Sequence, residues 1–530
     1  MTVNTALLLA FIAGFSYFSR RFMGDMFLER PIIIGPVVGL ILGDLKTGLF
    51  IGAELELIFM GVALVGGTAP ANMAVGSVLG TAFAITLGEG LEAAIAIALP
   101  GAVLGSFLEQ FAKILSSATV IRGADKYASE GNENGIQWML HLGNAIHFLA
   151  YFIPTFLALR FGSVYVESLF GSFPAWLRAG LSASASILPV LGFGMLLTIL
   201  GDKKVLPFFF IGFFIAIYTS FGVVGVSAMA VAVALVLEWQ KNRIIKDAGI
   251  KKEVEEVSKK AVDDMEFYEK GDVKKVFWRS FAIGSAFNYE RYQGLGFCFS
   301  MIPVLRRLYK GTEEFAPALQ RHMLFYNSNT WLPGIPLGVA ATMEARRKQI
   351  GDVTEDAITG MKSALMGPLA GIGDSLFWLT VRPIVGGIAV AMALDGNTFA
   401  PLFFFIMMNV VHLTVRWYAT KYGFSQGTKL VDEVSGDKVQ TIMTVATEVG
   451  LMSVGALVGT WLNITTPLVF TQGETSLVLQ DMLNKIMPKM LPLIATILVA
   501  LWYKKGGKPW MIMLALIGIG LVFGGLGILA

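Results

Sequence analysis

Apolar segments recur along the whole length of this chain, and only a few charged residues interrupt them. The first such segment is Thr5 to Tyr17, and the last is Trp510 to Leu529. A helix of about 20 apolar residues crosses a lipid bilayer and satisfies its own backbone hydrogen bonds there. At 55% hydrophobic and 15% charged residues, the chain is too apolar for a soluble globular protein, in which about a quarter of the residues are charged. The sequence therefore predicts an all-α, polytopic integral membrane protein.

Motifs for catalysis, metal binding and nucleic-acid binding are missing from the sequence. It contains no phosphate-binding P-loop, no GxSxG elbow, no HExxH and no Cys/His metal-ligand spacing. The net charge of +3 gives no reason to expect a nucleic-acid partner, and the single cysteine, Cys298, excludes an internal disulfide. We therefore predict no catalytic residue, metal site or cofactor in this chain.

The segment Leu365 to Ile384 combines a carboxylate with glycines and a proline inside an apolar run. Asp374 follows Pro368 and Gly373 closely, and Arg382 lies eight residues further on. A carboxylate at bilayer depth is costly unless it is paired or lines a wet cavity, and broken helices expose backbone dipoles to a polar solute. We expect a broken helix beside a solute path. Asp374 and Arg382 are expected either to pair with each other, or to take separate roles, one of them in contact with the solute.

The first part of the chain carries further polar groups in apolar surroundings. Pro31 to Gly43 is too short for a full crossing and contains two prolines, which predicts one arm of a re-entrant hairpin. Glu54 and Glu56 follow, about 200° apart on a helix, so only one of them can line a given cavity. We favour Glu54 for the solute path and Glu56 for a structural pair. Thr68, in the turn-like run Gly66 to Pro70, is a further candidate contact.

The composition changes abruptly at Glu238, where a stretch dense in both charge signs begins. We predict two helical membrane units, residues 1–240 and 272–530, joined by a charged cytoplasmic linker at 241–271. In the second unit, Asn288 and Asn327 carry amides that can bond hydroxyl groups. Glu54 and Thr68 from the first unit are expected to converge with Asn288, Asn327 and Asp374 on one polar solute.

Long motifs in both units carry a family likeness. The runs RPIIIGPVVGLILGDLKTGLFIGAELELIFMG and GGTAPANMAVGS resemble the IIC subunit of the mannose family of the bacterial phosphoenolpyruvate-dependent sugar phosphotransferase system. The runs NYERYQGLGFCFSMIPVLRRLY, LQRHMLFYNSNTWLPGIPLGVAATME and KSALMGPLAGIGDSLFWLTVRP resemble the IID subunit of the same family. These subunits are usually separate polypeptides, whereas here they are joined, either naturally or by engineering.

The resemblance implies group translocation across the bacterial cytoplasmic (inner) membrane. A hexose or amino sugar would be carried inward and phosphorylated by a cytoplasmic IIB protein, itself supplied by IIA, so the chain needs no phosphoacceptor residue of its own. The resemblance also implies an elevator-like movement and a homotrimer. It leaves the sugar open among mannose, glucose, fructose, sorbose and an amino sugar. Buried carboxylates and broken helices fit an ion-coupled secondary transporter as well, and this stays the alternative.

Overall fold

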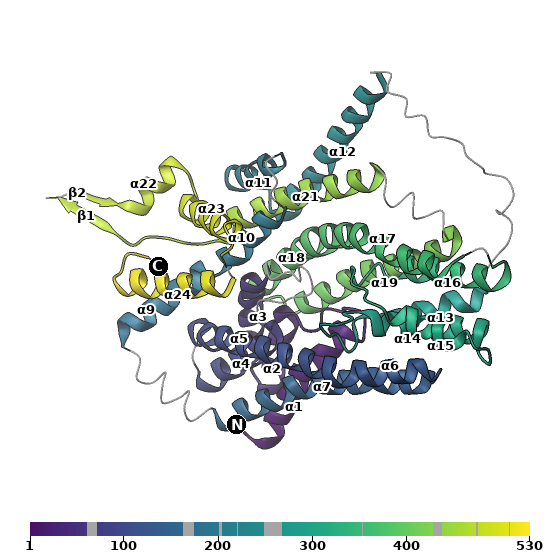
Figure 1. Cartoon of the computed structure of the whole chain (residues 1–530). Helices are drawn as coiled ribbons and strands as arrows, with labels where there is room; N and C mark the ends of the chain where they lie inside the picture. Colours follow the sequence, from purple (N-terminus) through teal and green to yellow (C-terminus); the bar gives the residue numbers. More distant parts are fainter. Residues whose placement is uncertain are drawn as a thin grey trace.

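The computed structural model describes eleven stretches of the chain. They are residues 1–60, 72–88, 90–162, 174–200, 204–219, 221–247, 268–351, 353–427, 437–472, 475–507 and 509–529. Almost all regular structure in these stretches is helical (Figure 1). Within them, five helices are long and apolar enough to cross a membrane, and a sixth span is formed if one bent helix pair is counted as a unit. The predicted all-α, polytopic membrane architecture is confirmed.

The described helices of the first half begin with a candidate membrane span, α1, followed by a short helical hairpin. In chain order they are α1 (Val3–Arg21), α2 (Pro31–Leu42), α3 (Leu45–Phe59), α4 (Met73–Leu87), α5 (Leu91–Ser116), the π-helix η1 (Ser117–Ile121), α6 (Arg122–Ser129), α7 (Glu133–Phe161), α9 (Ala175–Ile187), α10 (Pro189–Leu200), α11 (Leu206–Tyr218) and α12 (Val223–Asp247).

The second half adds a small β-hairpin to its helices. Its described elements are α13 (Lys270–Ser280), the 3-10 helix η2 (Phe281–Gly284), α14 (Gly294–Tyr309), α15 (Phe315–Met323), α16 (Gly334–Gln349), α17 (Glu355–Gly373), the π-helix η3 (Asp374–Val381), α18 (Arg382–Leu394), α19 (Ala400–Gln426), α21 (Asp437–Trp461), β1 (Val469–Gln472), β2 (Thr475–Val478), α22 (Leu479–Ile486), α23 (Met490–Lys504) and α24 (Pro509–Gly525). β1 and β2 pair antiparallel, with Val469 opposite Val478.

α2 and α3 form a short helical hairpin whose first arm is the apolar segment Pro31 to Gly43, and its re-entry into the membrane stays a prediction. The 12 residues of α2 span about 18 Å, well short of the roughly 30 Å hydrocarbon core. Gly43 ends α2 in the left-handed conformation (φ 85°), and the Asp44 side chain caps α3 by accepting from the Thr47 N–H. A Cβ on Gly35 would lie 2.5 Å from the Gly48 carbonyl oxygen, so the glycines allow the two arms to touch.

The last helices of the first half pack against the last helices of the second half. α9 lies along α24, α10 along α23, and α11 and α12 along α21 (Figure 1). Hydroxyl groups bond across these contacts, with Ser227 Oγ 2.9 Å from Ser453 Oγ and Thr198 Oγ1 donating to the Ala500 carbonyl at 2.9 Å. Small residues permit this close approach, as is usual between membrane helices. The halves are therefore held together by packing as well as by the chain between them.

The segment Leu365 to Ile384 does not contain the helix break that the sequence suggests. α17, η3 and α18 follow one another without interruption and form one candidate span, Glu355–Leu394, of 40 residues. The irregularity takes the form of the π-helix η3, which begins at Asp374. Pro368 is accommodated inside α17, and Pro383 occupies the first turn of α18. The expected break is wrong, but π-helical segments are themselves common at functional sites.

Candidate functional site

A polar cavity of about 120 Å³ lies beside Asp374, at the junction of the two halves. The first half contributes the end of α1 and the connection to α2, and the second half contributes the rest of the wall. The lining residues are Arg21, Asp25, Phe287, Gln293, Asn327, Ser328, Asn329, Thr330, Ala370, Asp374 and Trp378. Charged groups, amides, hydroxyls and two aromatic rings thus surround one space. We call it the Asp374 cavity.

Asp374 is held in place by an amide on the opposite wall. The Asn329 Nδ2 donates to Asp374 Oδ1 at 2.9 Å, and Asn329 Oδ1 accepts from the backbone N–H of Trp331 at 2.9 Å. A Cβ on Gly373 would lie 2.1 Å from Asn329 Cγ, so the glycine before Asp374 leaves room for this amide. The π-helical start of η3 and the glycine together set the carboxylate against Asn329.

The wall formed by residues 327–330 is an extended segment that Gln293 pins through a pair of hydrogen bonds. Gln293 Nε2 donates to the Ser328 carbonyl at 2.9 Å, and Gln293 Oε1 accepts from the Ser328 N–H at 3.1 Å. Ser328 Oγ donates to the Met366 carbonyl on α17 at 3.1 Å. These bonds fix residues 327–330 as one wall of the cavity.

The connection between α1 and α2 reaches the cavity through an unusual backbone. Asp25 and Phe27 adopt positive φ values of 76° and 64°, and Asp25 Oδ2 accepts from Thr330 Oγ1 at 3.0 Å. Arg416 on α19 braces this connection: its guanidinium donates to the carbonyls of Gly24 and Thr330. Residues in sparsely populated backbone regions persist only where the surroundings enforce them, and they cluster at functional sites.

Arg21 carries the positive charge of the cavity wall. Its Nη2 lies 3.6 Å from Glu109 Oε1, and its guanidinium stacks 4.2 Å from the ring centre of Phe287. Glu109 is also bound by Lys113 at 3.0 Å and by the Tyr151 hydroxyl at 2.9 Å. Of the three contacts that Glu109 makes, the one with Arg21 is the longest, so Arg21 is held less tightly than Lys113 and Tyr151.

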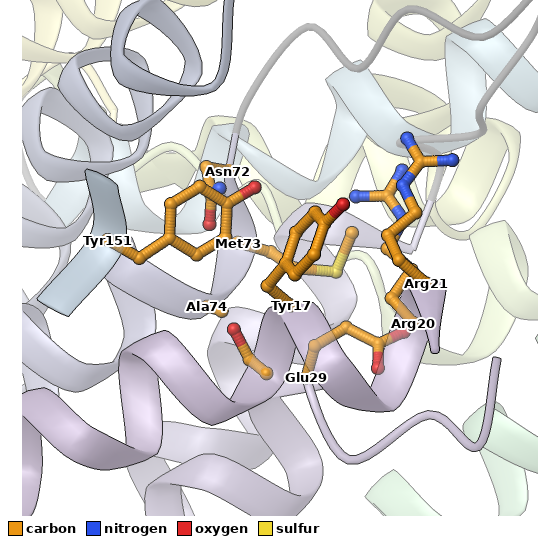
Figure 2. A pocket seen from close by; sticks show the side chains of 9 residues that line it. Tyr17, Arg20, Arg21, Glu29, Asn72, Met73, Ala74 and Tyr151 are labelled. Atoms are coloured by element: carbon orange, nitrogen blue, oxygen red, sulfur yellow. The ribbon is translucent and has the colours of Figure 1, made fainter. Parts of the chain in front are cut away.

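Arg21 also lines a second, much smaller space (Figure 2). Its volume is about 10 Å³, which is about enough for one water molecule. Tyr17, Arg20, Arg21, Glu29, Asn72 and Tyr151 are among the residues lining it. Figure 2 shows these side chains gathered from α1, the connection to α2, the start of α4, and α7. Arg21 lines both spaces.

Comparison with known proteins gives a family match for each half of the chain. Residues 3–236 match the family described as "PTS system sorbose-specific iic component", and residues 268–529 match "PTS system mannose/fructose/sorbose family IID component". The chain is 36% identical over 259 residues to the fructose permease IID component of Bacillus subtilis, which covers 48% of this chain and 94% of that protein. The chain belongs to the mannose/fructose/sorbose family of the phosphotransferase system.

Further relatives agree for both halves. The chain is 38% identical over 251 residues to the mannose-specific EIID component of Escherichia coli (strain K12), covering 46% of this chain and 88% of that protein. It is 34% identical over 210 residues to the fructose permease IIC component of Bacillus subtilis, covering 40% of this chain and 78% of that protein. The chain is a sugar phosphotransferase permease that joins IIC and IID components, and the ion-coupled alternative is not favoured.

Two of the residues predicted to contact the sugar line the Asp374 cavity of the permease. They are Asn327 and Asp374, both from the second half. Glu54, half-buried on α3, lies outside the cavity lining, and Thr68 lies outside the residues that the structure describes. Glu56 takes part in a buried ion pair with Arg30, in which Arg30 Nε donates to Glu56 Oε1 at 2.9 Å.

Asn288 and Arg382 have partners away from the cavity lining. Asn288 shapes a turn: its Oδ1 accepts from the backbone N–H groups of Glu290 at 3.0 Å and Arg291 at 2.8 Å. Arg382 donates to the Met60 carbonyl at 2.7 Å, at the end of α3. The expected face-sharing of Arg382 with Asp374 assumed a regular α-helix, and the π-helix η3 between them changes that angle. The structure places Arg382 against the first half instead.

Sequence reasoning missed the first-half residues that line the cavity, Arg21 and Asp25, and the second-half residues Gln293 and Asn329. A signal for the first pair was present, since RRFMGDMFLER places five charges between two apolar helices. Buried charges in a membrane protein are functional candidates by default. Gln293 carried no such signal, because its role depends on the path of a segment 35 residues away.

Proposed function

We propose that the Asp374 cavity is the sugar-binding site of this permease. The observation that carries the proposal is an anionic acceptor, Asp374, held by an amide on the wall of a polar cavity that both halves build. Binding sites in membrane transporters commonly lie between structural units and combine a few directed polar groups with apolar walls. Membership of the family implies a sugar substrate and cytoplasmic IIA and IIB partners.

The chemistry of the cavity suits a sugar. Each hydroxyl both donates and accepts, so Asp374 can accept from one hydroxyl while Asn327 bonds another. Bonds to the carboxylate are charge-assisted and therefore the stronger ones. The rings of Phe287 and Trp378 offer apolar surface to the C–H face of a sugar ring, and Arg21 can donate to a ring or hydroxyl oxygen. Thr68 and Asn288 stay predictions. In this proposal Glu54, which lies outside the cavity lining, does not contact the sugar, and Arg382 acts by fixing α18 to the end of α3.

The wider transport cycle is proposed from the family likeness. The sugar is carried inward across the bacterial cytoplasmic membrane and is phosphorylated by IIB, which receives its phosphoryl group from IIA. The chain acts as a homotrimer, and one body moves against the other in an elevator-like manner. Residues 1–240 and 272–530 are the two membrane units, with 241–271 as a cytoplasmic linker. The packing of α9 to α12 against α21, α23 and α24 supports one body shared by both halves.

Transport in reconstituted vesicles tests this function. Purified permease would be placed in vesicles that contain IIA, IIB and a phosphoenolpyruvate supply, and radiolabelled mannose, glucose, fructose, sorbose and an amino sugar would be offered outside. Sugar phosphate should accumulate only when phosphoenolpyruvate and both soluble proteins are present. Accumulation of free sugar driven by an ion gradient, without phosphoenolpyruvate, would contradict the proposal.

A further inference from the structure

The short helix α22 (Leu479–Ile486) separates its apolar and polar residues onto opposite faces. At 100° per residue, Leu479, Met482, Leu483 and Ile486 occupy one arc of about 100°. The opposite arc carries Gln480, Asp481, Asn484 and Lys485. No residue of α22 is buried, and the apolar face includes Met482, 46% exposed, and Ile486, 70% exposed. An apolar face of this kind needs a partner outside the described part of the protein.

The polar face of α22 has its own contacts, which fix how the helix is turned. Gln480 Oε1 accepts from the Thr466 N–H at 3.0 Å, and Gln480 Nε2 donates to Asn484 Oδ1 at 3.0 Å. These bonds hold the polar face toward the chain that enters β1. The apolar face is thereby turned away from that segment, and in Figure 1 α22 lies beside β1 and β2, away from the main body.

The bend after α22 determines its direction. α22 and α23 (Met490–Lys504) together have the length and hydropathy of a membrane span but meet at 76°. Lys489 lies at this bend with φ 58°, and its Nζ donates to the Leu462 carbonyl at 3.0 Å and to Asn463 Oδ1 at 3.2 Å. The bend is thus fixed to the end of α21. With α23, an apolar helix of 15 residues, as the membrane-crossing part of this pair, a helix at 76° to it lies close to the membrane plane.

One face of α23 is apolar and exposed, as expected of a side that faces lipid, and α22 directly precedes this helix. Ile494, Leu498 and Leu501 follow at helical spacing and are 44%, 60% and 50% exposed. Three lysines follow the apolar part of α23 (Lys504, Lys505 and Lys508) and two precede it (Lys485 and Lys489), so the positive-inside tendency favours the cytoplasm for its C-terminal end. α22 therefore lies at the opposite membrane surface, where the lipid-facing side of the permease continues into it.

From these observations we propose that α22 is an interfacial helix whose apolar face inserts into the outer leaflet of the membrane. Met482 and Ile486 contact the upper acyl chains, while Asp481 and Asn484 stay in the headgroup water layer. This is the behaviour expected of amphipathic helices that lie in the interface plane. The partner is lipid, and the proposal does not depend on the sugar-binding assignment. It gives α23 an anchor that sets its depth in the bilayer.

Spin-label accessibility tests the proposal in the full permease. The single native cysteine, Cys298, is buried, so a Cys298→Ser background leaves one reactive thiol per variant. Nitroxide labels would be placed by Met482→Cys and Ile486→Cys, with Asp481→Cys and Asn484→Cys as matched controls on the other face. The proteins would be reconstituted in phosphatidylethanolamine and phosphatidylglycerol vesicles. Collisions with apolar oxygen and with a water-soluble nickel chelate would be measured at each position.

At positions 482 and 486 the ratio of oxygen to nickel collisions should exceed that at 481 and 484 several-fold. Nickel collisions that dominate at all four positions would mean that α22 stands in water and would overturn the proposal. Low collision rates with both reagents at 482 and 486 would overturn it too, because they would show that protein, such as a second copy of the chain, covers this face. Quenching of Ile486→Trp fluorescence by brominated lipids, relative to the unsubstituted protein, gives a second readout that needs no label and must agree.

Discussion

Replacing Asp374 by asparagine tests the sugar site with the least disturbance of the fold. In the permease, Asn329 Nδ2 donates to Asp374 Oδ1 at 2.9 Å. An asparagine at 374 can present its own carbonyl oxygen to Asn329, so the contact between η3 and the 327–330 segment is kept. What changes is the group offered to the cavity, which loses its negative charge and half of its acceptor capacity.

The size of the effect follows from the kind of hydrogen bond that is lost. A bond to a charged group contributes about 1.5–3 kcal/mol, whereas a neutral bond contributes about 0.5–1.5 kcal/mol. The difference of about 1–2 kcal/mol corresponds to a roughly 5- to 30-fold weaker Kd for the sugar. Asp374→Ala should in addition destabilise the protein by about 1–3 kcal/mol, because it leaves the buried Asn329 amide without its partner.

Isothermal calorimetry on purified, folded permease measures this change directly, and Glu54→Gln is the matched control. Glu54 is a half-buried carboxylate on α3 of the other half, and it lies outside the lining of the Asp374 cavity. We expect Asp374→Asn to weaken sugar binding and Glu54→Gln to leave Kd unchanged. Unchanged affinity in Asp374→Asn, with weakened affinity in Glu54→Gln, would refute the assignment of the cavity.

Three further predictions follow from other parts of the molecule. Glu56→Gln should destabilise the permease by about 3–5 kcal/mol, seen as a lower Tm, because it leaves the buried Arg30 guanidinium without its carboxylate; Glu54→Gln should cost far less. Burial lowers the pKa of His322 from 6.5 to about 4, so the unfolded state takes up its proton first, and stability should fall as the pH drops from about 6.5 toward 4. At about 1.4 kcal/mol per unit, this loss is on the order of 3 kcal/mol, and His322→Gln should remove it. Protease cutting within residues 245–270, accessible from the cytoplasmic side, should leave transport largely intact, because the two halves are packed together without the linker.

Each of these predictions has a clear contrary outcome. A Tm of Glu56→Gln equal to that of wild type would mean that the Arg30 pair contributes nothing to stability. For the pH effect, His141→Gln is the control, since His141 is exposed on α7. If the acid-induced fall in Tm persisted in His322→Gln but disappeared in His141→Gln, protonation of His141 would be its cause, and the prediction for His322 would be wrong. Loss of transport after linker cutting, or cutting only from the outside, would exclude a passive cytoplasmic connection.

Local sequence determined those features that depend on neighbouring residues alone. The hairpin of α2 and α3 follows from a short apolar run, a left-handed glycine and a capping Asp44, all within a few residues of one another. A helical irregularity at Asp374 could likewise be predicted, because glycine, proline and a carboxylate coincide there. The separation of Glu54 and Glu56 onto different faces required only the helical repeat.

Tertiary structure decided how that irregularity is built and which residues share the cavity. Whether a glycine- and proline-containing helix breaks or widens into a π-helix depends on the partners that satisfy its backbone, which here include the wall formed by residues 327–330. Asn288 and Asn327 look alike in sequence, yet one bonds its own turn and the other lines the cavity. An amide bonds whatever donor or acceptor the fold brings near it, so residue type alone could not separate them.

The sequence also could not predict which helices of the two halves pack against each other. Hydropathy identifies helices such as α10, α11 and α24 as apolar, but lipid tails are as apolar as another helix, so burial does not choose their neighbours. Close backbone approach chooses them: a Cβ on Gly212 would lie 1.9 Å from the Met452 carbonyl oxygen. Thus the sequence by itself determined that this is a helical membrane permease with a carboxylate in its core, whereas only long-range packing decided that Arg21 and Asp25 of the first half meet Asn329 and Asp374 of the second.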